Sequence, residues 1–164
     1  METVYDTMDD ASLQKIKEIE RMAYDGTRYA QMQDCDTWQD MAQYMECDEE
    51  GVHFLCTQDY YVLIAEHEDY AEIVDLACLP DKRCDLKKVA QFVETFDKPL
   101  TLDSRELTSY PIIKYMEKRG RVVITEDEVY DWNNEKFHSM KMITTKALER
   151  NPSMAEIEEN DYER

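Results

Sequence analysis

Glycine and cationic side chains are both scarce in this sequence. Only three of the 164 residues are glycine, and 19 Lys and Arg stand against 38 Asp and Glu, a net charge of −19. Binding to nucleic acid or to an anionic membrane surface requires a cationic face, so this balance argues against both as direct partners. No apolar run approaches the roughly 20 residues of a membrane span, and we expect none.

Paired cysteines and clustered histidines are missing as well. The five cysteines are an odd number, none forms a CxxC pair, and the three histidines lie far apart along the chain. These features predict reduced thiols and no metal cofactor. The first residues carry neither a basic segment nor an apolar stretch, so we expect no secretory leader and a cytoplasmic location.

The chain nevertheless has enough apolar and aromatic residues to form a globular core. Apolar residues make up 43% of the chain, and eleven Tyr, four Phe and two Trp exceed what a disordered chain carries. Hydrophobic periodicity and turn residues predict an element order of α-α-β-β-β-α-β-α-β-β. The expected helices cover residues 11–25, 37–46, 86–96 and 108–120, and the expected strands cover 52–56, 60–65, 70–79, 99–103, 121–124 and 136–144.

This order predicts an α+β fold built on one sheet. The three strands at about ten-residue spacing are typical of an antiparallel meander, whereas the strand–helix–strand units require parallel crossovers. We therefore expect a mixed, mostly antiparallel sheet of six or seven strands with helices on both faces. Residues 1–145 are expected to form one domain, followed by an acidic C-terminal tail over 146–164.

Two segments give this order a family resemblance. The run Glu72-Ile73-Val74-Asp75-Leu76-Ala77-Cys78-Leu79-Pro80 resembles the fourth strand of the GNAT superfamily, the acyl-CoA-dependent N-acyltransferases, which ends in a Pro-containing turn. The second match is a strand, a helix ending Glu117-Lys118-Arg119-Gly120, and another strand. The resemblance covers about residues 11–145 and implies a single GNAT-like domain that uses acetyl-CoA.

The resemblance implies a backbone site for the coenzyme. In the family, exposed backbone groups of the fourth strand pair with the pantetheine arm, which here means Leu76, Ala77 and Cys78. The next loop in the family wraps the pyrophosphate with a Gln/Arg-x-x-Gly-x-Gly/Ala pattern, where glycine lets the backbone approach the phosphates.

That loop departs from the family pattern in this chain. Arg83 falls on the first basic position, but the two glycine positions fall on Leu86 and Lys88. Lys82, Arg83 and Lys87 instead form a local cationic group that would hold phosphates by side-chain charge. The competing interpretation is that these side chains are the solvated face of a helix.

The catalytic candidates follow from the same resemblance. A general base would be an acidic residue on the fourth strand, either Glu72 or Asp75; because they are three apart, we expect them on opposite faces, with only one reaching a cleft. The position of the family's general-acid tyrosine is Met116 here, and the adjacent Tyr115 is the substitute candidate. A helical step of one residue turns it by about 100°, which favours a packing role for that ring.

Two functions of different classes stay open. One is acyl transfer from a coenzyme A thioester to a cationic amine, which a strongly anionic protein attracts. The other is a catalytically inactive binding or assembly protein on the same fold, with a basic protein as partner. The stretch Thr101 to Gly120 also resembles small acetyltransferase-like proteins of tailed phages, which implies a virion-associated or host-directed role and a location in the host cytoplasm or virion. The sequence leaves the oligomeric state open.

Overall fold

A computed structural model describes residues 4–24 and 30–154 of the chain. These residues fall into two compact units, each with its own strands and helices. The first unit runs up to His67 and includes Glu72–Asp85, and the second holds Glu68–Ala71 and the chain from Leu86 onward.

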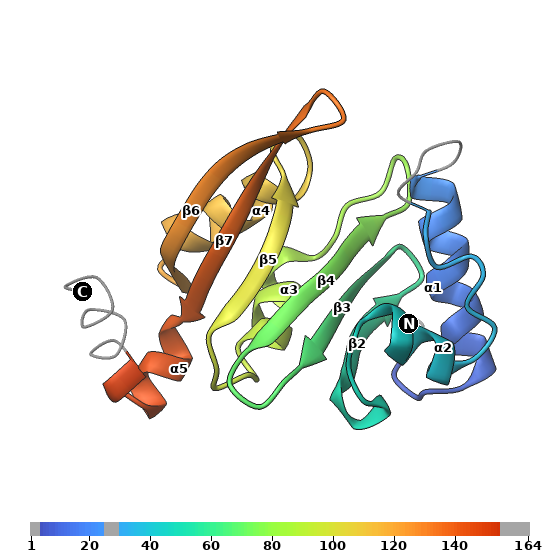
Figure 1. The fold of residues 1–164 in the computed structure, drawn as a ribbon, viewed down its shortest axis with the longest axis horizontal. Coiled ribbons are helices and arrows are strands. Elements are labelled where there is room, and N and C mark those ends of the chain that lie inside the picture. The colour runs from blue at the N-terminus through green and yellow to red at the C-terminus, as the bar shows by residue number, and fades with distance from the viewer. Residues whose placement is uncertain (1–3, 25–29, 155–164) are drawn as a thin grey trace. The chain divides into compact units, whose positions relative to one another are not determined.

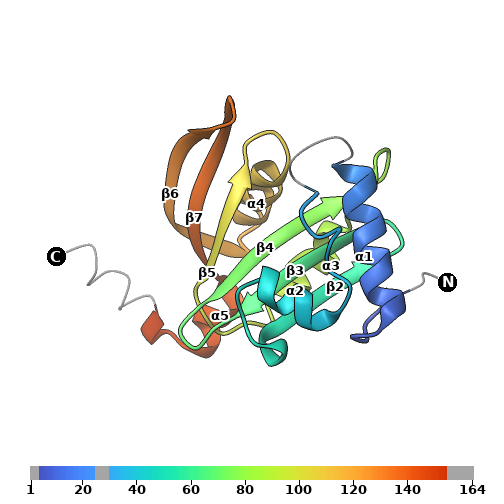
Figure 2. The same cartoon turned by 45° about the vertical axis from the view of Figure 1, so that its right-hand side comes forward.

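The first unit places two helices over a four-stranded sheet. Its strands are β1 (Val4–Tyr5), β2 (Val52–Thr57), β3 (Tyr60–Glu66) and β4 (Ala71–Cys78), in the order β1-β2-β3-β4. β1 pairs antiparallel with β2, and β2 pairs antiparallel with β3. Helices α1 (Asp10–Ala23) and α2 (Trp38–Tyr44) lie together over these strands, and a short 3-10 turn, η1 (Glu49–Gly51), leads into β2 (Figures 1 and 2).

Helix α1 presents an apolar stripe to the sheet. Leu13, Ile16 and Ile19, at three-residue spacing, are completely buried. The helix begins at Asp9, whose side chain accepts a hydrogen bond from the backbone nitrogen of Ser12 at 2.9 Å. Asp9 suits this position, because its carboxylate also interacts favourably with the positive end of the helix dipole.

β3 is the most buried strand of this unit. Every residue from Tyr60 to Ala65 is buried, which explains its continuous apolar run, because a strand covered on both faces has no polar side. The core on the α1 and α2 side of the strand includes Tyr61 and Leu63, together with Met41 of α2. Tyr61 therefore carries a hydroxyl group into an apolar core, where it requires a partner.

The second unit contains a three-stranded antiparallel sheet and three helices. β5 (Leu100–Arg105), β7 (Glu135–Thr144) and β6 (Val122–Trp132) lie side by side in that order (Figure 1). The helices are α3 (Leu86–Val93), α4 (Ser109–Lys118) and α5 (Thr145–Arg150). Helix α4 ends before Gly120, which has a φ of +74°, the left-handed conformation that glycine adopts most easily.

The β6–β7 hairpin corrects one sequence prediction. A strand was expected over 121–124 only, but β6 continues to Trp132 and pairs with β7 as far as Glu135. The turn is formed by Asn133 and Asn134, with φ of 55° and 64°, which suits a tight two-residue hairpin. Acidic residues are tolerated in this strand because its side chains beyond Thr125 are exposed to solvent.

The expected fold class is confirmed. The described residues form an α+β structure of seven strands with antiparallel pairing in β1–β3 and in β5–β7–β6. Part of the segment expected to be a tail forms α5, where Ala147 is fully buried against Ile143. No described helix is long and apolar enough to span a membrane.

Candidate active site

Asp75 of β4 is held by hydroxyl groups from two other elements. Its Oδ2 accepts a hydrogen bond from the Tyr61 hydroxyl of β3 at 2.6 Å, and its Oδ1 accepts from the backbone nitrogen of Leu76 at 2.9 Å. The hydroxyl of Tyr24, which caps the end of α1, lies 3.5 Å from Oδ1 and 3.2 Å from the carbonyl oxygen of Leu76. All these groups belong to the first unit.

The environment of Asp75 raises its proton affinity. Burial raises its pKa to about 6 and the charge of Glu20 acts in the same direction, while the hydrogen bonds from Tyr61, Leu76 and Tyr24 lower it. The side chain is half-buried. A carboxylate with a pKa near 6 is largely ionised at neutral pH and remains basic enough to accept a proton, as a general base requires.

Glu20 of α1 is a second carboxylate close to this group. It is fully buried, and its oxygens accept hydrogen bonds from the backbone nitrogen of Met32 at 2.9 and 3.1 Å and from Nε2 of Gln33 at 3.0 Å. Burial raises its pKa, and the charge of Lys17 and these hydrogen bonds oppose that effect. The sequence did not single out Glu20 as a buried carboxylate, since it lies within a helix rich in charged residues.

Glu72, the other expected base, is half-buried on β4. The charge of Glu72 also acts on Tyr44 of α2. Burial raises the pKa of the Tyr44 hydroxyl, and the negative charges of Asp75, Glu20 and Glu72 raise it further. Asp75 accepts hydrogen bonds from the hydroxyl groups of Tyr24 and Tyr61.

The expected pantetheine segment lies on β4 beside this group. Leu76 donates its N–H to Asp75 and accepts from Tyr24 through its carbonyl oxygen, so both of its backbone groups contact the cluster. Ala77 is buried in the core under α1 and α2. Cys78 is a half-buried free thiol, and burial raises its pKa to about 11, which makes it a poor nucleophile at neutral pH.

The expected phosphate-binding cations are exposed. Lys82 and Arg83 lie in the loop after β4, where Lys82 donates its backbone N–H to Leu79 at 3.1 Å and Asp81 has a φ of 67°. Lys87 lies in the first turn of α3, in the second unit. The structure thus places Lys82 and Arg83 together in one loop, free to meet a charged ligand from solvent.

Tyr115 lies on α4 of the second unit and is 40% exposed. Its hydroxyl accepts hydrogen bonds from Nε and Nη2 of Arg119 at 3.0 and 2.7 Å, and the Arg119 guanidinium also lies 5.1 Å from the ring centre. Met116, at the family's general-acid position, is buried. The two residues therefore point to different surroundings, as the helical step predicted.

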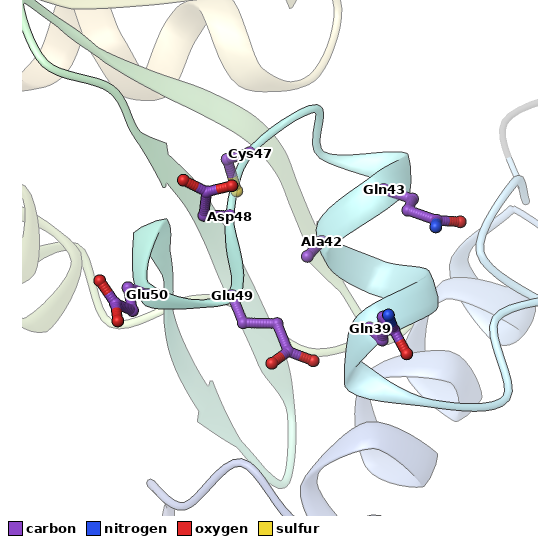
Figure 3. Close-up of a pocket in the computed structure, with 7 residues that line it drawn as sticks. All are labelled: Gln39, Ala42, Gln43, Cys47, Asp48, Glu49 and Glu50. Atoms are coloured by element: carbon purple, nitrogen blue, oxygen red, sulfur yellow. The ribbon is translucent and has the colours of Figure 1, made fainter.

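The first unit also carries an acidic pocket. Its volume is about 440 Å³, and it lies between α2 and η1, lined by Gln39, Ala42, Gln43, Cys47, Asp48, Glu49 and Glu50 (Figure 3). Burial raises the pKa of Cys47, and the charges of Asp48 and Glu72 contribute to the effect. Cys47 thus lines the pocket within electrostatic reach of Asp48 and Glu72, in surroundings that favour a cation.

A separate polar cluster occurs in the second unit around His138. Its ring stacks on Tyr110 with the centres 3.6 Å apart, Nδ1 lies 2.7 Å from Asp127, and Nε2 lies 3.3 Å from Glu106. Tyr110 donates to Asp127 at 2.9 Å. This cluster joins the β6–β7 hairpin to the start of α4. Among residues 4–24 and 30–154, no group of three or more His, Cys, Asp or Glu is arranged to hold a metal ion.

Several solved structures with a similar fold are described as acetyltransferases. One is described as a GNAT-family acetyltransferase from Desulfovibrio desulfuricans, with 11% identity, a TM-score of 0.57 and coverage of 87% of this chain and 99% of that one. Another is yncA of Salmonella typhimurium with acetyl-CoA, at 12% identity, TM-score 0.59 and coverage of 87% and 93%.

A third similar structure is the spermidine/spermine N-acetyltransferase SpeG of Vibrio cholerae. It shares 13% identity with this chain at a TM-score of 0.57, and the match covers 92% of this chain and 99% of that one. No protein-family model matches the chain, and no curated protein matches its sequence.

Proposed function

Because the chain has the fold of the GNAT acetyltransferases, we propose that it transfers an acyl group from a coenzyme A thioester to a cationic amine, with Asp75 as the general base. The observation that carries this proposal is the Asp75 carboxylate. It lies on β4, stays half-buried, and has a pKa raised to about 6 by burial. Carboxylates with pKa values shifted in this way are found preferentially at functional sites.

The chemistry removes two protons from the acceptor nitrogen and returns one to the leaving thiolate. Asp75 takes the first proton from the ammonium group of the acceptor, directly or through a water. The freed nitrogen then forms a bond to the thioester carbonyl carbon, and the carbon–sulfur bond breaks as the nitrogen releases its second proton to solvent. The thiolate leaves with a proton from a general acid, which solvent reprotonates. Tyr115 remains the candidate for that acid by its position in the sequence.

The coenzyme would be held more by charge than by backbone amides. The segment Asp81–Lys88 contains no glycine, so the close approach of backbone to phosphate that glycine permits is not expected there. Lys82 and Arg83 are exposed cations in an otherwise acidic chain, and Lys87 follows four residues after Arg83. Charge-assisted hydrogen bonds of this kind suit the pyrophosphate and ribose phosphate of coenzyme A.

The acidic surroundings support a cationic acceptor. The net charge is −19, and the pocket beside α2 is lined by three consecutive acidic residues, Asp48 to Glu50 (Figure 3). A field of one sign raises the encounter rate of an oppositely charged substrate by about 10- to 1000-fold in favourable clefts. Polyamines, aminoglycoside-like molecules and Lys-rich or N-terminal protein segments have the required charge. That SpeG is a spermidine/spermine N-acetyltransferase is consistent with this choice.

The second candidate is an inactive binding protein for a basic partner. The glycine-free segment after β4 and the buried Met116 at the family's general-acid position favour it. Each departure weakens one part of the family's machinery, so this alternative predicts neither coenzyme binding nor turnover.

Binding and turnover distinguish the two candidates. Acetyl-CoA at 100 times its dissociation constant should stabilise the protein by about 2.7 kcal/mol, read as a rise in melting temperature. Thiol release with a panel of amines should then be fastest for polycations and fall as salt rises. Asp75→Asn should abolish release, whereas Asp103→Asn should retain it; Asp103 is an exposed carboxylate that also accepts a hydrogen bond from a tyrosine.

The same two measurements can also refute the transferase proposal. If millimolar acetyl-CoA leaves the melting temperature unchanged and no amine yields thiol, the transferase proposal fails. A salt-sensitive complex with a basic protein under the same conditions would then support the binding function.

A further inference from the structure

We propose that Tyr61 and Tyr24 are positioning residues that hold the Asp75 carboxylate from two sides and let it gain and lose a proton without moving. This inference rests on the proposed function, in which Asp75 is the base. Tyr24 caps α1 and Tyr61 lies on β3, so it is the three-dimensional arrangement that brings them to Asp75 on β4.

Tyr61 fixes one carboxylate oxygen. Its hydroxyl lies 2.6 Å from Oδ2, a short distance typical of a hydroxyl donating to an ionised carboxylate. The ring is completely buried in the core under α1 and α2, which leaves it little freedom to turn away. Since Leu76 N–H holds Oδ1 at 2.9 Å, the carboxyl plane is set from both ends.

Tyr24 has one proton and two acceptors within reach. Its hydroxyl lies 3.5 Å from Oδ1 of Asp75 and 3.2 Å from the Leu76 carbonyl oxygen. When Asp75 is ionised, the Tyr24 proton can serve either oxygen. When Asp75 is protonated on Oδ1, the Tyr24 oxygen can accept that proton while its own proton goes to Leu76. Both states of the base are therefore hydrogen-bonded.

Other titratable groups surround this arrangement. Glu20 contributes a second negative charge from α1, Tyr44 of α2 lies within the electrostatic reach of Asp75, and Glu72 lies on β4 itself. Glu20 favours the protonated form of Asp75, whereas the hydroxyl of Tyr61 favours the ionised form. Removing these two influences must shift the titration of Asp75 in opposite directions, which a loss of packing alone would not do.

The experiment is a ¹³C NMR titration of the Asp75 carboxyl carbon in the full-length protein. Tyr61→Phe removes only the hydroxyl, so the midpoint should rise by about one pH unit, the amount expected for one hydrogen bond to a charged group. Tyr24→Phe should raise it by less, because its distance is longer. Glu20→Gln should lower it. Tyr130→Phe, which removes a 3.1 Å hydrogen bond to Asp103, is the matched control and should leave it unchanged.

The proposal is overturned if the Asp75 midpoint stays in place or falls in Tyr61→Phe. If Tyr61→Phe does not fold, Tyr24→Phe decides the question by the sign of its shift. This titration needs no turnover: absence of thiol release in the wild-type protein would refute the transferase function while the titration still tests the hydroxyl contacts. In an active enzyme, the acid limb of kcat/KM should shift in the same direction as the carboxyl midpoint.

Discussion

Replacing Asp75 with Asn should change how stability depends on pH. The pKa of Asp75 is raised to about 6 in the folded protein, against an ordinary value of 3.8, with burial as the main cause. The folded state therefore binds this proton more tightly than the unfolded state. Its contribution to stability is complete below the unfolded pKa and is lost as the pH rises through the folded one.

The size of the effect follows from the two pKa values. A difference of about two units corresponds to about 3 kcal/mol between the low-pH and high-pH limits. Roughly 2 kcal/mol of this falls between pH 4.5 and 7.5, because the proton is already partly lost from the unfolded chain at pH 4.5. Asn has no such proton, so the variant lacks this part of the pH dependence.

Urea unfolding of both proteins at several pH values and constant ionic strength measures the difference. Asp75→Asn should gain about 2 kcal/mol relative to wild type between pH 4.5 and 7.5. The Asn amide facing the N–H of Leu76 is expected to change the free energy of unfolding by the same amount at every pH. The diagnostic quantity is therefore how the difference in free energy of unfolding between variant and wild type changes with pH. A difference that does not change with pH, or that changes with the opposite sign, would refute the assigned environment of Asp75.

Three further predictions concern the coenzyme and the second unit. Arg83→Ala combined with Lys87→Ala should weaken acetyl-CoA binding at least tenfold by calorimetry, since each charge-assisted phosphate contact contributes about 1.5 kcal/mol or more. Glu94→Gln should destabilise the fold by about 2 kcal/mol in urea, because the buried Glu94 carboxylate accepts from Nη2 of Arg121 at 2.6 Å. Gly120→Ala should lower stability by about 1 kcal/mol in the same assay, because Gly120 has a φ of +74°. An unchanged dissociation constant, or unfolding midpoints equal to wild type, would contradict the respective prediction.

Much of the element order could be predicted because periodicity reports burial. Leu13, Ile16 and Ile19 mark the sheet-facing side of α1, and the apolar run from Tyr60 marks a strand covered on both faces. The extent of β6 could not be predicted in the same way. Its side chains beyond Thr125 face solvent, so the sequence there is rich in charged residues and lacks the alternation of apolar and polar residues that marks a half-buried strand. Only the pairing with β7 shows that this segment is a strand.

Of the candidate site, only the residues on β4 could be predicted from the sequence. Asp75 could be singled out because the β4 segment resembles the family, yet the groups that set its chemistry come from other elements. Tyr61 lies 14 residues before it and Tyr24 lies 51 residues before it. In the sequence, Tyr61 is one aromatic residue in an apolar run and Glu20 one charge among many, because nothing local distinguishes a buried hydroxyl or carboxylate from its neighbours.

The most direct test of the proposed function is the rate of coenzyme A release against pH, with a polyamine acceptor at saturating acetyl-CoA. Wild-type protein should show a rate that rises with pH through a midpoint near 6, because Asp75 must be ionised to accept the proton. Asp75→Asn should remain slow throughout and lack that step. A variant with the wild-type rate and the same profile would contradict the assignment of Asp75 as the base.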